Sequence, residues 1–87
     1  MRREGLRTTT YFDEKVRRDR PYVTVEGCLA VLAQPLRREV QTDGRWRCWG
    51  WVDLPDGLGT RILRVVTLAD GTLHNAFIDR GYREEAT

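Results

Sequence analysis

The chain has 87 residues, which fits one small domain and leaves no room for separate catalytic and binding domains. Its composition is 40% hydrophobic and 32% charged, which is typical of a globular domain and argues against intrinsic disorder. The net charge of +2 is too small to indicate a nucleic-acid partner by itself. The longest apolar run, Cys28–Ala33, is too short to span a membrane, and the charged start predicts no secretory signal, so we expect a cytoplasmic protein.

Two short helices are predicted in the first third of the chain. Phe12 and Val16 lie four residues apart, on one face of a helix from about residue 9 to 18. Thr24 is a typical N-cap for a second helix, and Pro35 ends it. The residues expected to face the core from this second helix follow the i, i+3, i+4, i+7 spacing: Val25, Cys28, Leu29 and Leu32.

After residue 35 the hydrophobic period changes to two, which predicts strands. Asp43-Gly44 and Asp70-Gly71 each separate two such runs, and Asp-Gly favours a two-residue type I′ hairpin turn. The predicted class is therefore α+β, with two short N-terminal helices packed on a four-stranded antiparallel meander. We expect a single domain over 1–87, divided into flexible residues 1–8, a helical hairpin 9–34, the sheet 36–79 and a C-terminal tail 80–87.

The two-residue turns would fix which side chains share a face of the sheet. In the second hairpin the predicted pairs are Thr67–His74, Val66–Asn75, Val65–Ala76, Arg64–Phe77 and Leu63–Ile78. The more apolar face, with Val65, should pack on the helices. The opposite face is mixed and is a candidate binding surface. In the first hairpin they pair Arg38 with Trp49, and Trp49 and Trp51 share a face with arginines.

Two interpretations of this face fit. The tryptophans can pack on arginine stems as part of a small core, or they can form a surface for base stacking or protein docking. The small size of the core favours the first interpretation.

Several kinds of catalytic site are excluded by residue counts. Cys28, Cys48 and His74 provide only three Cys/His candidates for zinc, so we expect no metal site, and both cysteines are expected as buried, reduced thiols. The chain contains no serine, which excludes a Ser/His/Asp hydrolase. No glycine-rich phosphate loop is present, and we expect no cofactor.

The positive charge is concentrated in the first third of the chain and in the first hairpin, whereas residues 48–79 are acid-rich. Lys15 is the only lysine among 15 basic residues, and arginine is the better ligand for phosphate. The candidate nucleic-acid-binding residues are Lys15, Arg17, Arg18, Arg45 and Arg47.

Short motifs over residues 11–83 resemble a known superfamily. They are VRRDRPYVTVE (16–26), VLAQP (31–35), DGR (43–45), WG (49–50), LRVVT (63–67) and NAFIDR (75–80). With this order of elements, the chain resembles the RelE/ParE-like toxin superfamily, in particular its BrnT-like and DUF4258-type small proteins. It departs from that branch at Tyr11-Phe12-Asp13, where a histidine often stands, and at Pro21, which replaces a glycine.

The resemblance implies a metal-independent endoribonuclease that cuts messenger RNA, free or on the ribosome, and is neutralised by an antitoxin. Such enzymes use the 2′-hydroxyl of the substrate as nucleophile. The resemblance implies Arg64 and Arg80 as the phosphate ligands and His74 or Tyr82 as the acid or base. The expected register puts Arg64 and His74 on opposite faces unless a bulge intervenes.

Two alternatives remain open from the sequence. The Trp/Arg face can bind a protein partner or form a homodimer without catalysis. The resemblance to ParE-like proteins also allows inhibition of a target such as gyrase without any cleavage.

Overall fold

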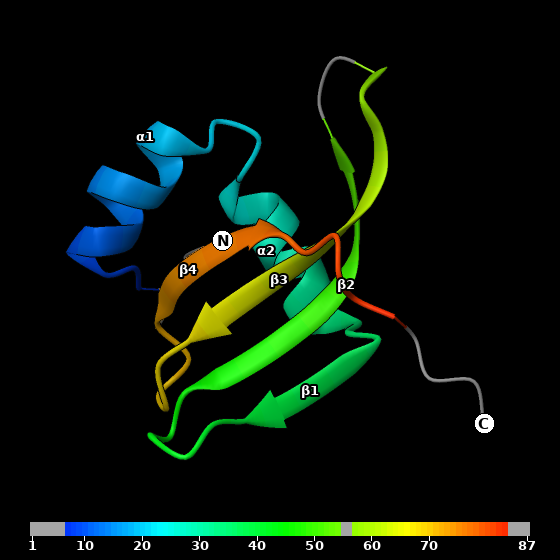
Figure 1. The fold of residues 1–87 in the computed structure, drawn as a ribbon. Helices are drawn as coiled ribbons and strands as arrows, with labels where there is room; N and C mark the ends of the chain where they lie inside the picture. Colours follow the sequence, from blue (N-terminus) through cyan, green and yellow to red (C-terminus); the bar gives the residue numbers. More distant parts are fainter. Residues whose placement is uncertain (1–6, 55–56, 84–87) are drawn as a thin grey trace.

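A computed structural model describes residues 7–54 and 57–83 of the chain. It shows N-terminal helices followed by a four-stranded antiparallel sheet in the order β1-β2-β3-β4, so the predicted α+β class is confirmed (Figure 1). In the described part, no helix has the length and apolar character needed to cross a membrane. The strands are β1 (Arg37–Val40), β2 (Trp46–Leu54), β3 (Gly59–Thr67) and β4 (Leu73–Ile78).

The first helix contains a π-helical segment, η1 (Phe12–Val16), followed by a short α-helical segment, α1 (Arg17–Asp19). The Thr9 hydroxyl accepts a hydrogen bond from the Phe12 N–H at 3.0 Å, which caps the start of this helix. Phe12 and Val16 are fully buried, as their spacing predicts.

The segment before the first helix is bonded to β4. The Leu73 N–H donates to the Arg7 carbonyl and the Thr9 N–H donates to the Leu73 carbonyl, both at 2.9 Å. Arg7 and Thr8, which fall in the segment predicted to be flexible, are therefore held against the sheet edge, and the rest of that segment, 1–6, lies outside the described residues.

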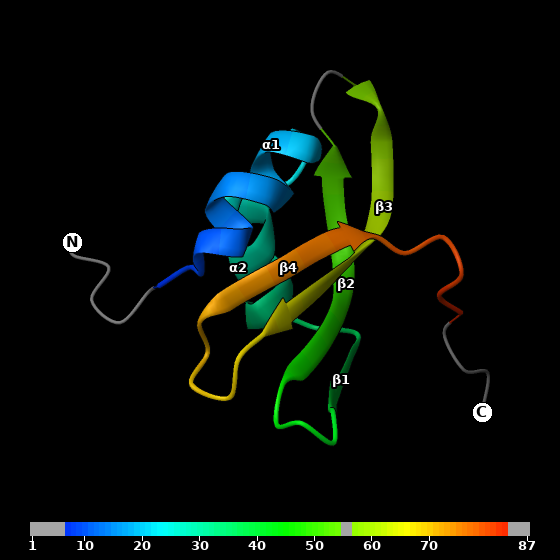
Figure 2. The same cartoon turned by 60° about the vertical axis from the view of Figure 1, so that its left-hand side comes forward.

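The second helix, α2 (Val25–Ala33), begins and ends where the sequence predicts. The Thr24 hydroxyl accepts from the Gly27 N–H at 2.9 Å, and the helix stops two residues before Pro35. Both helices lie on one side of the sheet, and residues 79–83, after β4, run away from the helices (Figure 2). Of the four residues expected to face the core only Cys28 is fully buried, and Val31 joins it.

The face of the sheet that packs on the helices is the one predicted. Leu63, Val65 and Ala76 are at most 2% exposed and form the core with Phe12 and Val31. We call the opposite side the open face. Its residues are Arg37 and Glu39 of β1, Arg47, Trp49 and Trp51 of β2, Ile62, Arg64 and Val66 of β3, and Asn75 and Phe77 of β4.

The register predicted for the first hairpin is wrong by one residue: Arg37, not Arg38, pairs with Trp49. The Gln41 N–H donates to the Arg45 carbonyl, so residues 42–44 form a three-residue loop. The Asp43 carboxylate accepts from the Arg45 N–H at 3.0 Å, and Gly44 has φ +89°, the left-handed conformation that closes such a loop. The hydrogen bond that the Asp43 carboxylate accepts therefore favours the longer loop over the type I′ turn.

The second Asp-Gly forms the same kind of loop, but a bulge restores the predicted register. Thr67 pairs with Leu73 while Val66 pairs with Asn75, so His74 is an extra residue in β4. The predicted pair Thr67–His74 is therefore wrong. The pairs beyond the bulge are confirmed: Val66–Asn75, Val65–Ala76, Arg64–Phe77 and Leu63–Ile78.

Gly50 in β2 allows α2 to approach the sheet closely. A Cβ atom on Gly50 would lie 3.2 Å and 3.3 Å from the two γ-carbons of Val31, which is itself buried. We expect Gly50→Val to lower the free energy of unfolding by about 1–3 kcal/mol, because the added methyl groups overpack this contact. Denaturant unfolding measures the change, with Gly81→Ala as a control, since a Cβ there would meet its nearest atom at an ordinary 3.6 Å. Equal stability of the two variants would contradict this account of Gly50.

Candidate functional site

A group of arginines surrounds one buried tryptophan on the open face. Trp49, in the middle of β2, is only 6% exposed. The guanidinium carbons of Arg37, Arg47 and Arg64 lie 5.9, 5.7 and 5.5 Å from the centroid of its ring. The strand pairs Arg37–Trp49 and Trp49–Arg64 place two of them directly across from it. We call Trp49 and these three residues the arginine cluster; cation–π attraction stabilises it.

Two carboxylates are bound to this cluster. Glu39 forms an ion pair with Arg37 and accepts a hydrogen bond from Nη2 of Arg47 at 2.9 Å. Asp79 accepts a hydrogen bond from Nε1 of Trp49 at 2.8 Å and lies 3.9 Å from Nη1 of Arg64. Three guanidiniums against two carboxylates leave an excess of positive charge, which favours an anionic ligand.

The segment after β4 adds a phenol to the open face. The Tyr82 ring stacks on Trp49, with 5.8 Å between centroids and 29° between planes. Asp79 holds this segment in place, because its Oδ1 accepts from the Gly81 N–H at 3.0 Å. A hollow of about 330 Å³ lies here, which is large enough for a nucleotide-sized ligand. Its lining residues are Arg37, Glu39, Arg47, Trp49, Asp79, Gly81, Tyr82 and Arg83.

Arg64 lies beside this hollow rather than in its lining. Its guanidinium carbon is 5.5 Å from the Trp49 ring and 5.1 Å from the Phe77 ring, so the side chain lies between two aromatic rings. Its buried Nε has no hydrogen-bond partner among the described residues. This packing suits Arg64 to hold Trp49 and Asp79 in place and to contribute positive potential, while Arg37 and Arg47 face the ligand space.

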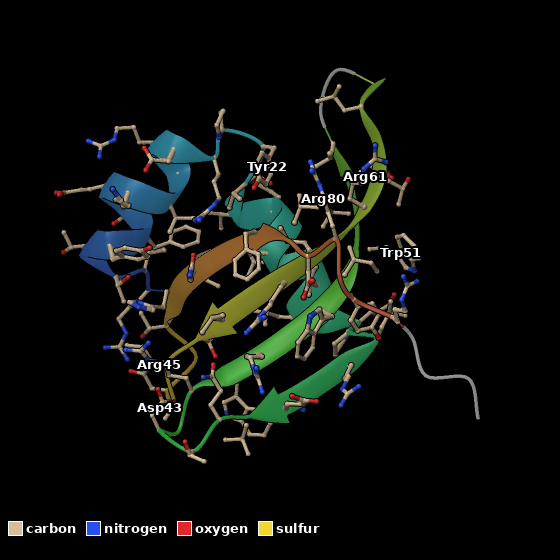
Figure 3. All side chains as sticks on the ribbon, in the orientation of Figure 1. Tyr22, Asp43, Arg45, Trp51, Arg61 and Arg80 are labelled. Carbon is tan, nitrogen blue, oxygen red and sulfur yellow. The ribbon has the colours of Figure 1, made fainter. Side chains whose placement is uncertain are left out.

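The structure separates the four residues predicted to be catalytic. Arg64 and Tyr82 both lie on the open face, and each lies against the Trp49 ring. His74, at the bulge of β4, lies near the first helix instead, with Nδ1 3.1 Å from the Thr9 hydroxyl. Arg80 is exposed and lies near Tyr22 and Arg61, beside the long β2–β3 hairpin (Figure 3).

The residues predicted to bind nucleic acid are also divided. Lys15, Arg17 and Arg18 are exposed on the first helix, where Lys15 and Arg18 lie 3.6 Å and 3.5 Å from Asp19. Arg45 lies at the first hairpin turn (Figure 3), 3.7 Å from Asp43. Arg47 alone of this set lines the hollow.

Sequence reasoning missed Arg37, Glu39 and Asp79. The strand period of two places Arg37, Glu39, Arg47 and Trp49 on one face once the three-residue loop sets the register. Asp79 follows the predicted last strand, and its N–H still donates to the Ile62 carbonyl at 3.0 Å, so the ladder continues to this residue.

No family model, curated protein or solved structure matches this chain in the comparisons. We therefore infer the function from the geometry of the chain's own side chains.

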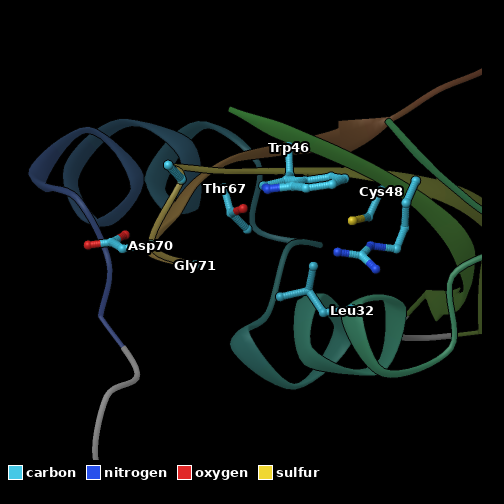
Figure 4. Close-up of a pocket in the computed structure, with 8 residues that line it drawn as sticks. Leu32, Trp46, Cys48, Thr67, Asp70 and Gly71 are labelled. Carbon is cyan, nitrogen blue, oxygen red and sulfur yellow. The ribbon is translucent and has the colours of Figure 1, made fainter. Parts of the chain in front are cut away.

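A second cavity, of about 420 Å³, opens on the helix side near the end of α2 (Figure 4). Leu32, Trp46 and Cys48 line it, and Arg38 lies 4.6 Å from the centroid of the Trp46 ring. Asp70, at its rim, is bound to Thr72 and Arg7.

Both cysteines are buried free thiols. Burial raises the pKa of Cys28 to about 12 and also raises that of Cys48, so neither is a reactive thiolate near neutral pH. Among the residues that the structure describes, no group of three or more His, Cys, Asp or Glu side chains is arranged to hold a metal ion.

His74 should titrate below the ordinary histidine range. Burial lowers its pKa from 6.5, and the nearby positive charge of Arg45 lowers it further. Because it is the only histidine, NMR of its ring protons gives a single titration curve, with an expected midpoint below 6.5. Because the pKa of His74 is lower in the folded chain than in the unfolded chain, the neutral imidazole stabilises the fold. This stabilisation is fully present above pH 6.5 and is lost as the pH falls through the folded pKa. His74→Gln should remove this loss of stability at low pH. An NMR titration midpoint above 6.5 for His74 would contradict the burial described here.

Proposed function

We propose that the open face binds single-stranded RNA and cleaves its phosphodiester bonds in the cytoplasm. The observation that supports this most is the position of Glu39 between Arg37 and Arg47, in a hollow that Tyr82 also lines. These side chains provide two phosphate ligands, a carboxylate that can accept a proton and a phenol that can donate one.

The reaction follows from these roles. Arg37 and Arg47 bind the non-bridging oxygens of the phosphate, and Glu39 takes the proton of the neighbouring 2′-hydroxyl. The 2′-oxygen then attacks phosphorus and the bond to the 5′-oxygen breaks. Tyr82 donates its phenolic proton to that leaving oxygen. The products are a 2′,3′-cyclic phosphate and a 5′-hydroxyl, and solvent returns the proton from Glu39 to Tyr82.

The resemblance to RelE/ParE-like toxins supports the same substrate class. Under this proposal the chain acts on messenger RNA, free or on the ribosome, and a partner antitoxin inhibits it by covering the open face. Such a partner would carry acidic side chains, which suit the excess positive charge of the arginine cluster.

Incubation of the purified chain with an end-labelled RNA tests the proposal. A matched oligonucleotide with 2′-deoxyribose at every position provides the control, since it lacks the nucleophile. We expect cleavage of the RNA only, with products that carry cyclic phosphate and 5′-hydroxyl ends. An intact RNA, both with and without ribosomes, would reject the proposed activity, and cleavage of both oligonucleotides would reject the mechanism.

A second candidate function is favoured by Trp51. This residue also belongs to the open face and is 57% exposed, unlike the buried Trp49. An exposed tryptophan beside a charged cluster is typical of protein interfaces, so the face can bind a protein or a second copy of the chain without catalysis. Light scattering over a range of concentrations tests the homodimer. A dimer that Trp51→Ala converts to a monomer supports it, and a strict monomer excludes it.

A further inference from the structure

A third cavity lies on the helix side of the sheet, away from the open face. It is formed where the long β2–β3 hairpin extends beyond the end of β4, and its volume is about 480 Å³. We call it the hairpin cleft. Its lining residues are Tyr22, Leu54, Leu58, Arg61, Ile78 and Arg80.

The wall of the hairpin cleft is apolar. Leu54 and Ile78 come from the ends of two strands and are half-buried, and Tyr22 packs against the core from the loop before α2. Leu58 completes the wall and is 58% exposed, which is high for a leucine. A cavity of this size with such a wall fits the body of a small organic ligand.

Two guanidiniums stand at this wall. Arg61 and Arg80 are both exposed, and Figure 3 shows them close together near Tyr22. Neither forms an ion pair with a carboxylate within residues 7–54 and 57–83. The arginine cluster of the open face differs, because Glu39 and Asp79 lie beside its guanidiniums.

The backbone makes room for one of these guanidiniums. Nη1 of Arg61 donates a hydrogen bond to the Thr60 carbonyl at 2.9 Å, which fixes the side chain along the hairpin. Gly59 has φ +97°, and a Cβ atom there would lie 2.9 Å from this Nη1. The glycine therefore allows Arg61 to take this position. Within the described residues its other guanidinium N–H groups form no ion pair, so they can meet an anion.

We propose that the hairpin cleft binds a small carboxylic acid with an apolar chain. The apolar wall of Leu54, Leu58 and Ile78 takes the chain, and the carboxylate meets Arg61 and Arg80. Arginine suits this contact because its planar fork matches a carboxylate. The site is separate from the proposed RNA-cleaving hollow and does not depend on that function.

Calorimetric titration of the full chain with sodium octanoate tests this proposal, with octanol as the uncharged comparison. We expect saturable binding of octanoate at low ionic strength, weakened about tenfold or more in the Arg61→Gln/Arg80→Gln double variant. Leu58→Asp should weaken it similarly, because it places a negative charge in the wall. Arg7→Gln is the matched control, since Arg7 is an exposed arginine elsewhere, bound to Asp70.

All the substituted side chains are exposed, so the substitutions should leave the fold intact and a change in octanoate binding reports on the site itself. If octanol binds as tightly as octanoate, the guanidiniums do not bind the carboxylate and the proposal is wrong. Unchanged binding in the double variant would place the ligand elsewhere. No saturable binding at about 5 mM octanoate would overturn the proposal.

Discussion

Replacing Glu39 by glutamine will lower the rate of RNA cleavage by about 10²–10⁴-fold, the usual contribution of a general base. Glutamine has nearly the same shape, but it cannot take the proton of the 2′-hydroxyl. Binding should not weaken, because the substitution removes a negative charge from between Arg37 and Arg47. The rate is measured with an end-labelled RNA under single-turnover conditions, and the affinity is measured with a non-cleavable 2′-O-methyl oligonucleotide.

Arg47→Gln provides the contrasting variant. It removes a guanidinium that the mechanism assigns to the phosphate, so both the affinity and the rate should fall. Arg7→Gln controls for the general loss of one positive charge at an exposed position. If Glu39→Gln cuts RNA as fast as the wild-type chain, Glu39 is not the base and the proposed mechanism is wrong.

Replacing Phe12 by alanine will destabilise the fold by about 3–5 kcal/mol, the usual cost of truncating a buried phenylalanine. Phe12 is fully buried, and it joins the first helix to the core that the sheet and α2 form. A domain of this size is typically stable by about 5–15 kcal/mol, so this change removes a large part of the total. Thermal and denaturant unfolding followed by circular dichroism measure the loss.

The neighbouring residue provides the control. Tyr11 is 41% exposed and its ring centroid lies 5.2 Å from that of His74, so Tyr11→Ala should cost no more than about 1.5 kcal/mol. Equal melting temperatures for the two variants would show that the first helix does not contribute to the core as described.

The parts of the fold that depend on local spacing could be predicted from the sequence. Phe12 and Val16 are buried because they are one helical turn apart, and Val65 and Ala76 are buried because strands alternate faces. The register of the first hairpin could not be predicted from Asp-Gly alone. The three-residue loop is favoured by a hydrogen bond that the Asp43 carboxylate accepts from the Arg45 N–H.

The one-residue difference in the register of the first hairpin decides which side chains form the candidate site. It places Arg37 beside Trp49, so Glu39, the proposed base, lies on the same face. The sequence predicts Tyr82 as a site residue, but its contact with Trp49 depends on the path of the chain after β4. Asp79 fixes this path by accepting a hydrogen bond from the Gly81 N–H. Contacts of this kind join residues distant in the sequence and leave no periodic pattern.

NMR of the side-chain N–H groups shows whether RNA binds at the open face. Trp49 lies on that face, with its indole N–H bound to Asp79, whereas Trp46 lies on the helix side under Arg38. On titration with a 2′-O-methyl RNA oligonucleotide, we expect the indole signal of Trp49 and the Nε–H signal of Arg47 to shift and saturate together. The indole signal of Trp46 should stay in place. Shifts confined to Trp46 or to the arginines of the first helix, with Trp49 unchanged, would contradict it.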